Sequence, residues 1–177
     1  MQHCKNKIEL NQEVQKAYFR LGVIAFEDKL FDNALQCFEK VYQMDAEFQK
    51  PELCWRMGEL QYKLSNAGKA LKLIDITQAQ IAPTDDPHLL MLKGKILDKL
   101  KQFSQSVKEY EKILEILQTR PISAEFEGGV HFRYGWACIR GRMEIQEALE
   151  HLLLAHSLMP RNVEVLVKLS SVLFKEL

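Results

Sequence analysis

Hydrophobic residues recur along this chain three and four positions apart, which is the spacing of one face of a helix, and no segment alternates strictly as a half-buried strand does. Prolines separate the periodic segments. Pro51 and Pro87 suit a first helical turn, whereas Pro83, Pro121 and Pro160 follow helix ends. The pattern predicts helices over residues 14–28, 31–44, 51–64, 67–81, 87–100, 103–118, 124–140, 144–158 and 163–177. Two of these helices have a predicted N-cap residue, Asp86 and Asn162.

A short motif recurs within this pattern. The four residues that end at Gly22, at Gly58 and at Gly135 each read aromatic, arginine, bulky residue and glycine. Gly58 lies 36 residues after Gly22, Gly94 a further 36, and Gly135 another 41. The chain therefore contains four repeated units with one glycine each.

A second pair of positions repeats with the glycines. Twelve residues after each of the first three glycines comes a small residue, and four residues later a large one; both positions shift by one in the fourth unit. The pairs are Ala34 with Phe38, Ala70 with Ile74, Ser106 with Tyr110, and Ala148 with Leu152. Small residues let two antiparallel helices approach, and a large residue one turn later fills the gap. The repeated glycines are therefore predicted to be structural.

These positions resemble the tetratricopeptide repeat (TPR) family over nearly all of residues 15–177. The resemblance implies an all-α fold, an α-solenoid of about four helical hairpins followed by a C-terminal helix. We predict an N-terminal tail over 1–13 and a TPR-like domain over 14–177. Its repeats are expected at about 15–50, 51–86, 87–123 and 124–160, with a terminal helix at 163–177.

Composition excludes several classes of function. The 24 basic residues balance the 24 acidic ones, so no net charge favours direct binding to nucleic acid. Apolar stretches of four to five residues are far shorter than the roughly 18 that a membrane span requires. Four scattered cysteines and no recognisable leader indicate a cytoplasmic or nuclear protein.

No arrangement typical of catalysis is present in the sequence. The closest histidines, His151 and His156, are five apart and point to different sides of a helix. Cys54 and Cys138 are expected to be small buried residues rather than nucleophiles. The single glycine pair is not followed by the lysine of a phosphate loop. We predict no enzyme activity, no cofactor and no metal.

In TPR arrays the first helices of successive hairpins line a concave groove. The resemblance maps that groove onto the positions three and two before each glycine, and one and four after it. Aromatic and arginine side chains there are typical of binding hot spots. The candidate partner-binding residues are Phe19, Arg20, Val23, Trp55, Arg56, Glu59, Tyr62, Lys95, Phe132, Arg133 and Trp136. Alternatively, several of these aromatic residues belong to the hairpin core.

The resemblance predicts a scaffold or adaptor that binds a partner peptide or helix. It does not extend to the carboxylate clamp of chaperone-binding TPR proteins, which requires lysine and asparagine where Phe19 and Val23 stand. Two alternatives remain: a chaperone or assembly factor that holds its partner transiently, and a module of transcription regulation. The second rests on residues 17–24 and 34–38, which are similar to repeats in TPR corepressors and histone-demethylase arrays.

The segment 163–177 has more apolar surface than one neighbouring hairpin can bury. On a helical wheel its apolar residues cover more than half the circumference, and only Glu164, Lys168, Ser171 and Lys175 form a polar strip. A helix that merely covers the end of a solenoid is expected to have a polar outer face. We therefore expect self-association through this helix, or packing of a further hairpin helix against it.

Overall fold

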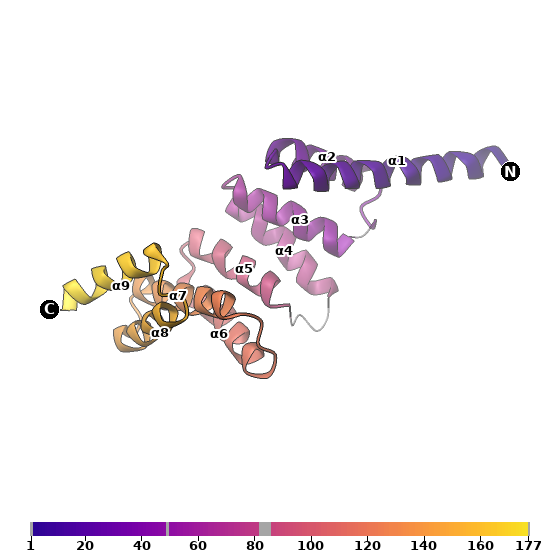
Figure 1. Ribbon diagram of the computed structural model, residues 1–177. Helices are drawn as coiled ribbons and strands as arrows, with labels where there is room; N and C mark the ends of the chain where they lie inside the picture. Colours follow the sequence, from indigo (N-terminus) through magenta and orange to yellow (C-terminus); the bar gives the residue numbers. More distant parts are fainter. Residues whose placement is uncertain (1, 49, 82–85, 177) are drawn as a thin grey trace. The chain divides into compact units, whose positions relative to one another are not determined.

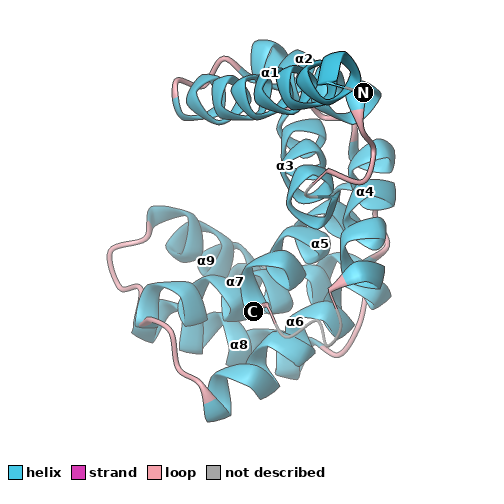
Figure 2. Cartoon of the chain, turned by 90° about the vertical axis from the view of Figure 1, so that its right-hand side faces the viewer, coloured by secondary structure: helices cyan, strands magenta, loops and turns pink. Residues whose placement is uncertain are grey.

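The computed structural model describes residues 2–48, 50–81 and 86–176, and all regular structure in those ranges is helical (Figures 1 and 2). The helices are α1 (Gln2–Glu27), α2 (Phe31–Met44), α3 (Lys50–Lys63), α4 (Ala67–Gln80), α5 (Pro87–Lys99), α6 (Phe103–Thr119), α7 (Ala124–Gly141), α8 (Ile145–Leu158) and α9 (Val163–Glu176). They belong to two compact units, an N-terminal unit of residues 1–84 and a C-terminal unit of residues 85–177. The predicted all-helical fold is confirmed.

The predicted N-caps are also confirmed. The Oδ1 atom of Asp86 accepts a hydrogen bond from the His88 amide at 2.9 Å, next to the proline that begins α5. Asn162 Oδ1 accepts hydrogen bonds from the amides of Glu164 at 3.0 Å and Val165 at 3.3 Å. Amides in the first turn of a helix have no carbonyl partner within it, so these side chains fix where α5 and α9 begin.

Each repeated glycine lies against the large side chain predicted to fill the gap between the two helices of its hairpin. The contacts are Gly22 with Phe38, Gly58 with Ile74, Gly94 with Tyr110, and Gly135 with Leu152. A Cβ atom on Gly22 would lie 2.7 Å from Cε1 of Phe38, well inside van der Waals contact. Any larger residue at these positions would force the hairpin helices apart, so the predicted structural role of the glycines is confirmed.

The four hairpin turns share one conformation. In each turn a residue other than glycine lies in the left-handed region, with φ between 55° and 66°. These residues are Lys29, Ser65, Lys101 and Arg142. The next residue donates its amide hydrogen to the carbonyl five residues earlier, as Leu30 does to Ala25 at 2.8 Å. This is the Schellman motif, which closes the last turn of the first helix and starts the second.

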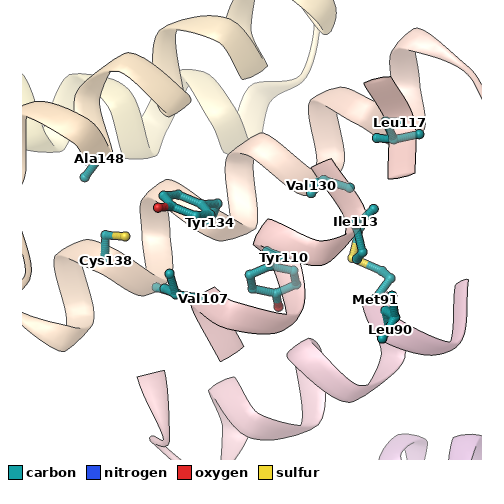
Figure 3. Close-up of a cluster of buried hydrophobic side chains, with 11 residues drawn as sticks. Leu90, Met91, Val107, Tyr110, Ile113, Leu117, Val130, Tyr134, Cys138 and Ala148 are labelled. Atoms are coloured by element: carbon teal, nitrogen blue, oxygen red, sulfur yellow. The ribbon is translucent and has the colours of Figure 1, made fainter. Parts of the chain in front are cut away.

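Clusters of buried side chains hold the hairpins together. In the N-terminal unit, Ala34, Phe38 and Val41 of α2 pack against Leu53, Met57 and Leu60 of α3. In the C-terminal unit, one cluster joins α5, α6, α7 and α8 around Tyr110 (Figure 3). Another joins α7, α8 and α9 around Leu152. Each unit therefore stacks its hairpins as solenoid repeats do, with every helix packed on its neighbours in sequence.

The predicted N-terminal boundary was wrong. Residues 1–13 were expected to form a tail, but α1 begins at Gln2, twelve residues before the predicted helix start. Residues 2–13 include no proline or glycine, and several are good helix formers, so nothing interrupts the helix there. All other predicted helix ends lie within one residue of those observed. That residues 14–177 act as a single domain stays a prediction.

Candidate partner-binding surfaces

Three predicted binding residues lie on α1. Phe19 and Val23 are half-buried against the core cluster of α2 and α3, whereas Arg20 is exposed. The Phe19 ring centroid lies 5.5 Å from that of Phe38 and 6.1 Å from that of Phe48. Phe19 and Val23 therefore contribute to the core and present only part of their surface to solvent.

The next four predicted residues lie half-buried on α3: Trp55, Arg56, Glu59 and Tyr62. Two ion pairs run along this helix. Both Nε and Nη2 of Arg56 lie 3.2 Å from Oε1 of Glu52, and the Lys63 ammonium lies 3.7 Å from Glu59. Pairs of this kind, exposed to solvent and one turn apart, contribute only about 0.3–0.5 kcal/mol each. These ion pairs orient the Arg56 and Glu59 side chains but are weak, so a charged group of a partner can replace Glu52 or Lys63 in them.

The remaining predicted residues lie in the C-terminal unit, Lys95 on α5 and Phe132, Arg133 and Trp136 on α7. Phe132 is only 7% exposed and packs in the cluster that includes Val165 and Leu169 of α9. Trp136 is half-buried beside it, with the Lys168 ammonium 4.4 Å from its ring centroid. Phe132 thus belongs to the core, in agreement with the alternative interpretation of these aromatic residues. Binding by the others stays a prediction.

A polar contact near Arg133 joins three helices of the C-terminal unit. The Tyr110 hydroxyl on α6 donates a hydrogen bond to Oδ2 of Asp98 on α5 at 2.8 Å. Burial raises the pKa of Asp98, while hydrogen bonds from Ser106 and Tyr110 and the positive charge of Arg133 act in the opposite direction. Asp98 occupies the groove position four residues after Gly94. Arg133 also occupies a groove position, so this unit has an acidic and a basic groove residue that interact electrostatically.

Two histidines that are twenty residues apart in sequence meet between α7 and α8. The Nδ1 atoms of His131 and His151 lie 2.8 Å apart, which is hydrogen-bonding distance. The His151 ring stacks on Tyr134, with centroids 4.0 Å apart, and the Tyr134 hydroxyl donates to Glu147 at 2.5 Å. Burial lowers the pKa of both histidines. This pair was not predicted from the sequence, because its two histidines lie twenty residues apart and no local spacing connects them.

Neither buried cysteine is suited to nucleophilic chemistry. Cys54 is fully buried on α3 and Cys138 is 1% exposed on α7. Burial raises the pKa of both thiols, that of Cys138 to about 12, so they remain protonated at neutral pH. Both act as the small core residues that the sequence predicted.

A shallow depression of about 270 Å³ lies where α5 and α7 begin. His88, Ile122, Ser123, Glu125 and Phe126 line it. The His88 and Phe126 rings meet edge to face, with centroids 4.8 Å apart, and the side chain of Ser123 caps α7. The lining is largely apolar, and no sequence motif predicts it.

Among the described residues, no three histidine, cysteine or carboxylate side chains gather as a metal site would require. None of the described helices is long and apolar enough to span a bilayer.

Comparison with known proteins agrees with this geometry. Residues 15–48 and 87–116 match the family model of the tetratricopeptide repeat. These two segments are tetratricopeptide repeats. The first matched segment spans the second half of α1 and all of α2, and the other spans α5 and most of α6. The other two hairpins of the TPR array repeat the same contact between glycine and large residue, at Gly58 with Ile74 and at Gly135 with Leu152.

Solved structures share the TPR fold at low sequence identity. MamA (residues 41 to the end) from Desulfovibrio magneticus RS-1 is 18% identical, with a TM-score of 0.76 over 92% of this chain and 85% of that one. The apo form of RapI is 16% identical, with a TM-score of 0.80 over 92% of this chain and 64% of that one. Likeness at this level concerns the fold alone. A comparison with curated protein sequences gives no match, and nothing adds to the predicted likeness to corepressor arrays.

Proposed function

We propose that this chain is a protein-interaction scaffold or adaptor whose TPR first helices bind a peptide or helix of a partner protein. The observation that carries the proposal is the surface of α3, where Trp55 and Arg56 are both half-exposed although their neighbours Leu53, Cys54 and Met57 are buried. An aromatic ring beside a guanidinium group is the combination that dominates binding hot spots.

The partner would be recognised by a hydrophobic residue and a carboxylate or carbonyl group. The ring of Trp55 offers apolar area at low entropic cost, and the Arg56 guanidinium, held by Glu52, can take up an acceptor from the partner. A cytoplasmic or nuclear location, and a purely non-catalytic role, remain part of this proposal.

The test begins with the whole chain as bait, followed by identification of the captured protein and calorimetry with its purified binding segment. Changing Trp55 and Arg56 together to alanine should weaken binding by roughly 2 kcal/mol or more. The control variant, Lys69→Ala with Lys72→Ala, alters exposed residues of α4 and should bind as the wild type does.

Thermal unfolding separates a binding role from a core role. If Trp55 and Arg56 bind a partner, the double variant should melt close to the wild type. A large fall in Tm with unchanged binding per folded molecule would instead assign Trp55 to the core and remove the proposal's main support. The chaperone alternative predicts fast dissociation of the same complex, which surface plasmon resonance measures directly.

A further inference from the structure

One side of α1 carries an uninterrupted apolar stripe that none of the described residues of the N-terminal unit covers. The stripe residues are Leu10, Val14, Ala17, Leu21 and Ile24, all of which are exposed. Their spacing of four, three, four and three residues is the heptad pattern of a coiled-coil seam. The residues of α1 that pack on α2 and α3, such as Phe19 and Phe26, lie on the opposite side of the helix.

The equivalent side of the other first helices is buried. In α1, Ala17 lies five residues before the repeated glycine and Leu21 lies one residue before it. Ile24 lies two residues after that glycine. The same positions in α3 are Leu53, Met57 and Leu60, and in α7 they are Val130, Tyr134 and Ala137. All six are at most 8% exposed, because α2 covers α3 and α6 covers α7. By contrast Leu21 is 53% exposed and Ile24 54%.

The N-terminal part of α1 extends beyond the helix that α1 pairs with. α1 has 26 residues and α2 has 14, so α1 runs well past the end of α2 (Figure 1). Residues 10–14 are exposed on every side of the helix. Isolated helical segments of this length are marginal in water, so a second helix against Leu10 and Val14 would stabilise the extension.

We propose that the stripe binds the same stripe of a second copy of this chain, as an antiparallel two-helix coiled coil. A preceding second helix in a TPR stack also runs antiparallel to the first helix that it covers, so the second copy's α1 occupies the place that α2 takes on α3. The contact is two-fold symmetric, as in most homodimers.

Charge selects one register for this pairing. Glu13 and Arg20 lie seven residues apart on the same flank of the stripe. When Val14 faces Ala17 of the second copy, Leu10 faces Leu21 of the second copy. Glu13 then lies opposite position 18 of the second copy. Arg20 of the second copy is two residues further along that helix, an offset of about 3 Å along the helix axis. Symmetry provides this attractive pair twice. The register shifted by one heptad would instead place Glu13 beside Glu27 and the two Arg20 side chains together, which costs energy.

The first experiment measures the mass of the full chain by sedimentation equilibrium across a range of concentrations. Replacing Val14 and Leu21 with glutamate should raise the dissociation constant of this contact roughly 100-fold. A matched control, Gln12→Glu with Gln36→Glu, adds the same charge at exposed positions off the stripe and should associate as the wild type does. A wild type that is monomeric throughout, which would leave the stripe to a different protein, overturns the proposal. So does association that the stripe variant does not weaken.

A charge swap tests the register. Glu13→Arg alone and Arg20→Glu alone each create two repulsive pairs and should weaken association about tenfold. The double variant E13R/R20E restores attraction in the antiparallel register and should recover wild-type association. In a parallel dimer these residues do not meet, so unchanged affinity in the single variants contradicts the arrangement. Weakening that the double variant fails to recover contradicts it equally. Circular dichroism of each variant verifies that the helices remain folded.

Discussion

The pair formed by His131 and His151 depends on a single proton. A hydrogen bond between two Nδ1 atoms 2.8 Å apart needs one imidazole to donate and the other to accept, so the accepting ring must be neutral and at most one ring can be charged. Protonation of both would place two donors and two positive charges in contact. The surrounding groups are Glu127, Tyr134 and Cys138 on α7, Glu147 on α8, and Glu111 on α6, and the carboxylates only partly oppose the effect of burial.

This pair predicts a loss of stability in mild acid. The pKa of both histidines is lowered in the folded chain, so below the unfolded value of about 6.5 the unfolded chain binds more protons than the folded one. The free energy of unfolding should therefore be constant above that pH and fall below it, by at most about 1.4 kcal/mol per pH unit for each proton.

Urea unfolding between pH 7.5 and 5 measures the slope. His151→Gln removes one titrating ring and should flatten the dependence, whereas His88→Gln, at an exposed position of α5, should leave it unchanged. Equal slopes in all three proteins would show that the pair does not control acid stability.

Contacts between residues could be predicted from the sequence only where the same spacing recurs along the chain. The pairing of Gly94 with Tyr110 could be predicted, because it repeats at a fixed spacing in every unit. The contact of His131 with His151 occurs once, across a hairpin, and has no periodic signal. The assignment of Phe132 to the core also required the structure, because the family's groove positions do not show how closely α9 packs against α7.

At the scale of helices, the hairpin turns contain avoidable strain. An L-amino acid in the left-handed region costs about 1–2 kcal/mol, and glycine adopts this conformation freely. Yet Lys29, Ser65, Lys101 and Arg142 all occupy it. The repeat therefore retains its glycine where two helices touch and tolerates strain where they are linked.

The turns predict a stabilising substitution. Lys101→Gly should raise the free energy of unfolding by about 0.5–1 kcal/mol, because relief of strain exceeds the greater entropy of glycine in the unfolded chain. Lys108→Gly, on the exposed side of α6, provides the opposite control and should lower it by about 1 kcal/mol. Chemical denaturation of both variants measures the difference. A destabilised Lys101→Gly protein would mean that the lysine side chain itself supports the turn.

Helix boundaries were predictable wherever a cap, a proline or a repeat marks them. Pro87 and Asp86 set the start of α5, and Asn162 that of α9. The start of α1 could not be predicted, because the repeat pattern includes only the part of the helix that pairs with α2. Past the end of α2, helix formation depends on local propensity, and no residue between 2 and 13 opposes it.

At the scale of the whole chain, α9 exposes apolar positions that a second helix covers in an earlier hairpin. Counted from their N-caps, Leu166 and Leu173 of α9 correspond to Leu90 and Leu97 of α5. The latter two are 1% exposed in α5, which packs against α6, whereas Leu166 is 40% and Leu173 43% exposed. Exposed apolar residues are common singly, but here several share one helix.

The last prediction concerns that surface. Val167 is 56% and Phe174 80% exposed, so replacing both with glutamate should leave the fold intact and abolish any association through α9. If α9 pairs with α9 of a second molecule while α1 pairs with α1, two separate two-fold contacts on one chain generate an assembly larger than a dimer. Light scattering should then show wild-type particles that grow beyond the dimer with concentration. V167E/F174E should stop at the dimer, as should the α1 variant with Val14 and Leu21 replaced by glutamate, and the four changes together should give a monomer. A V167E/F174E protein with the same mass distribution and solubility as the wild type would remove α9 as a contact between copies.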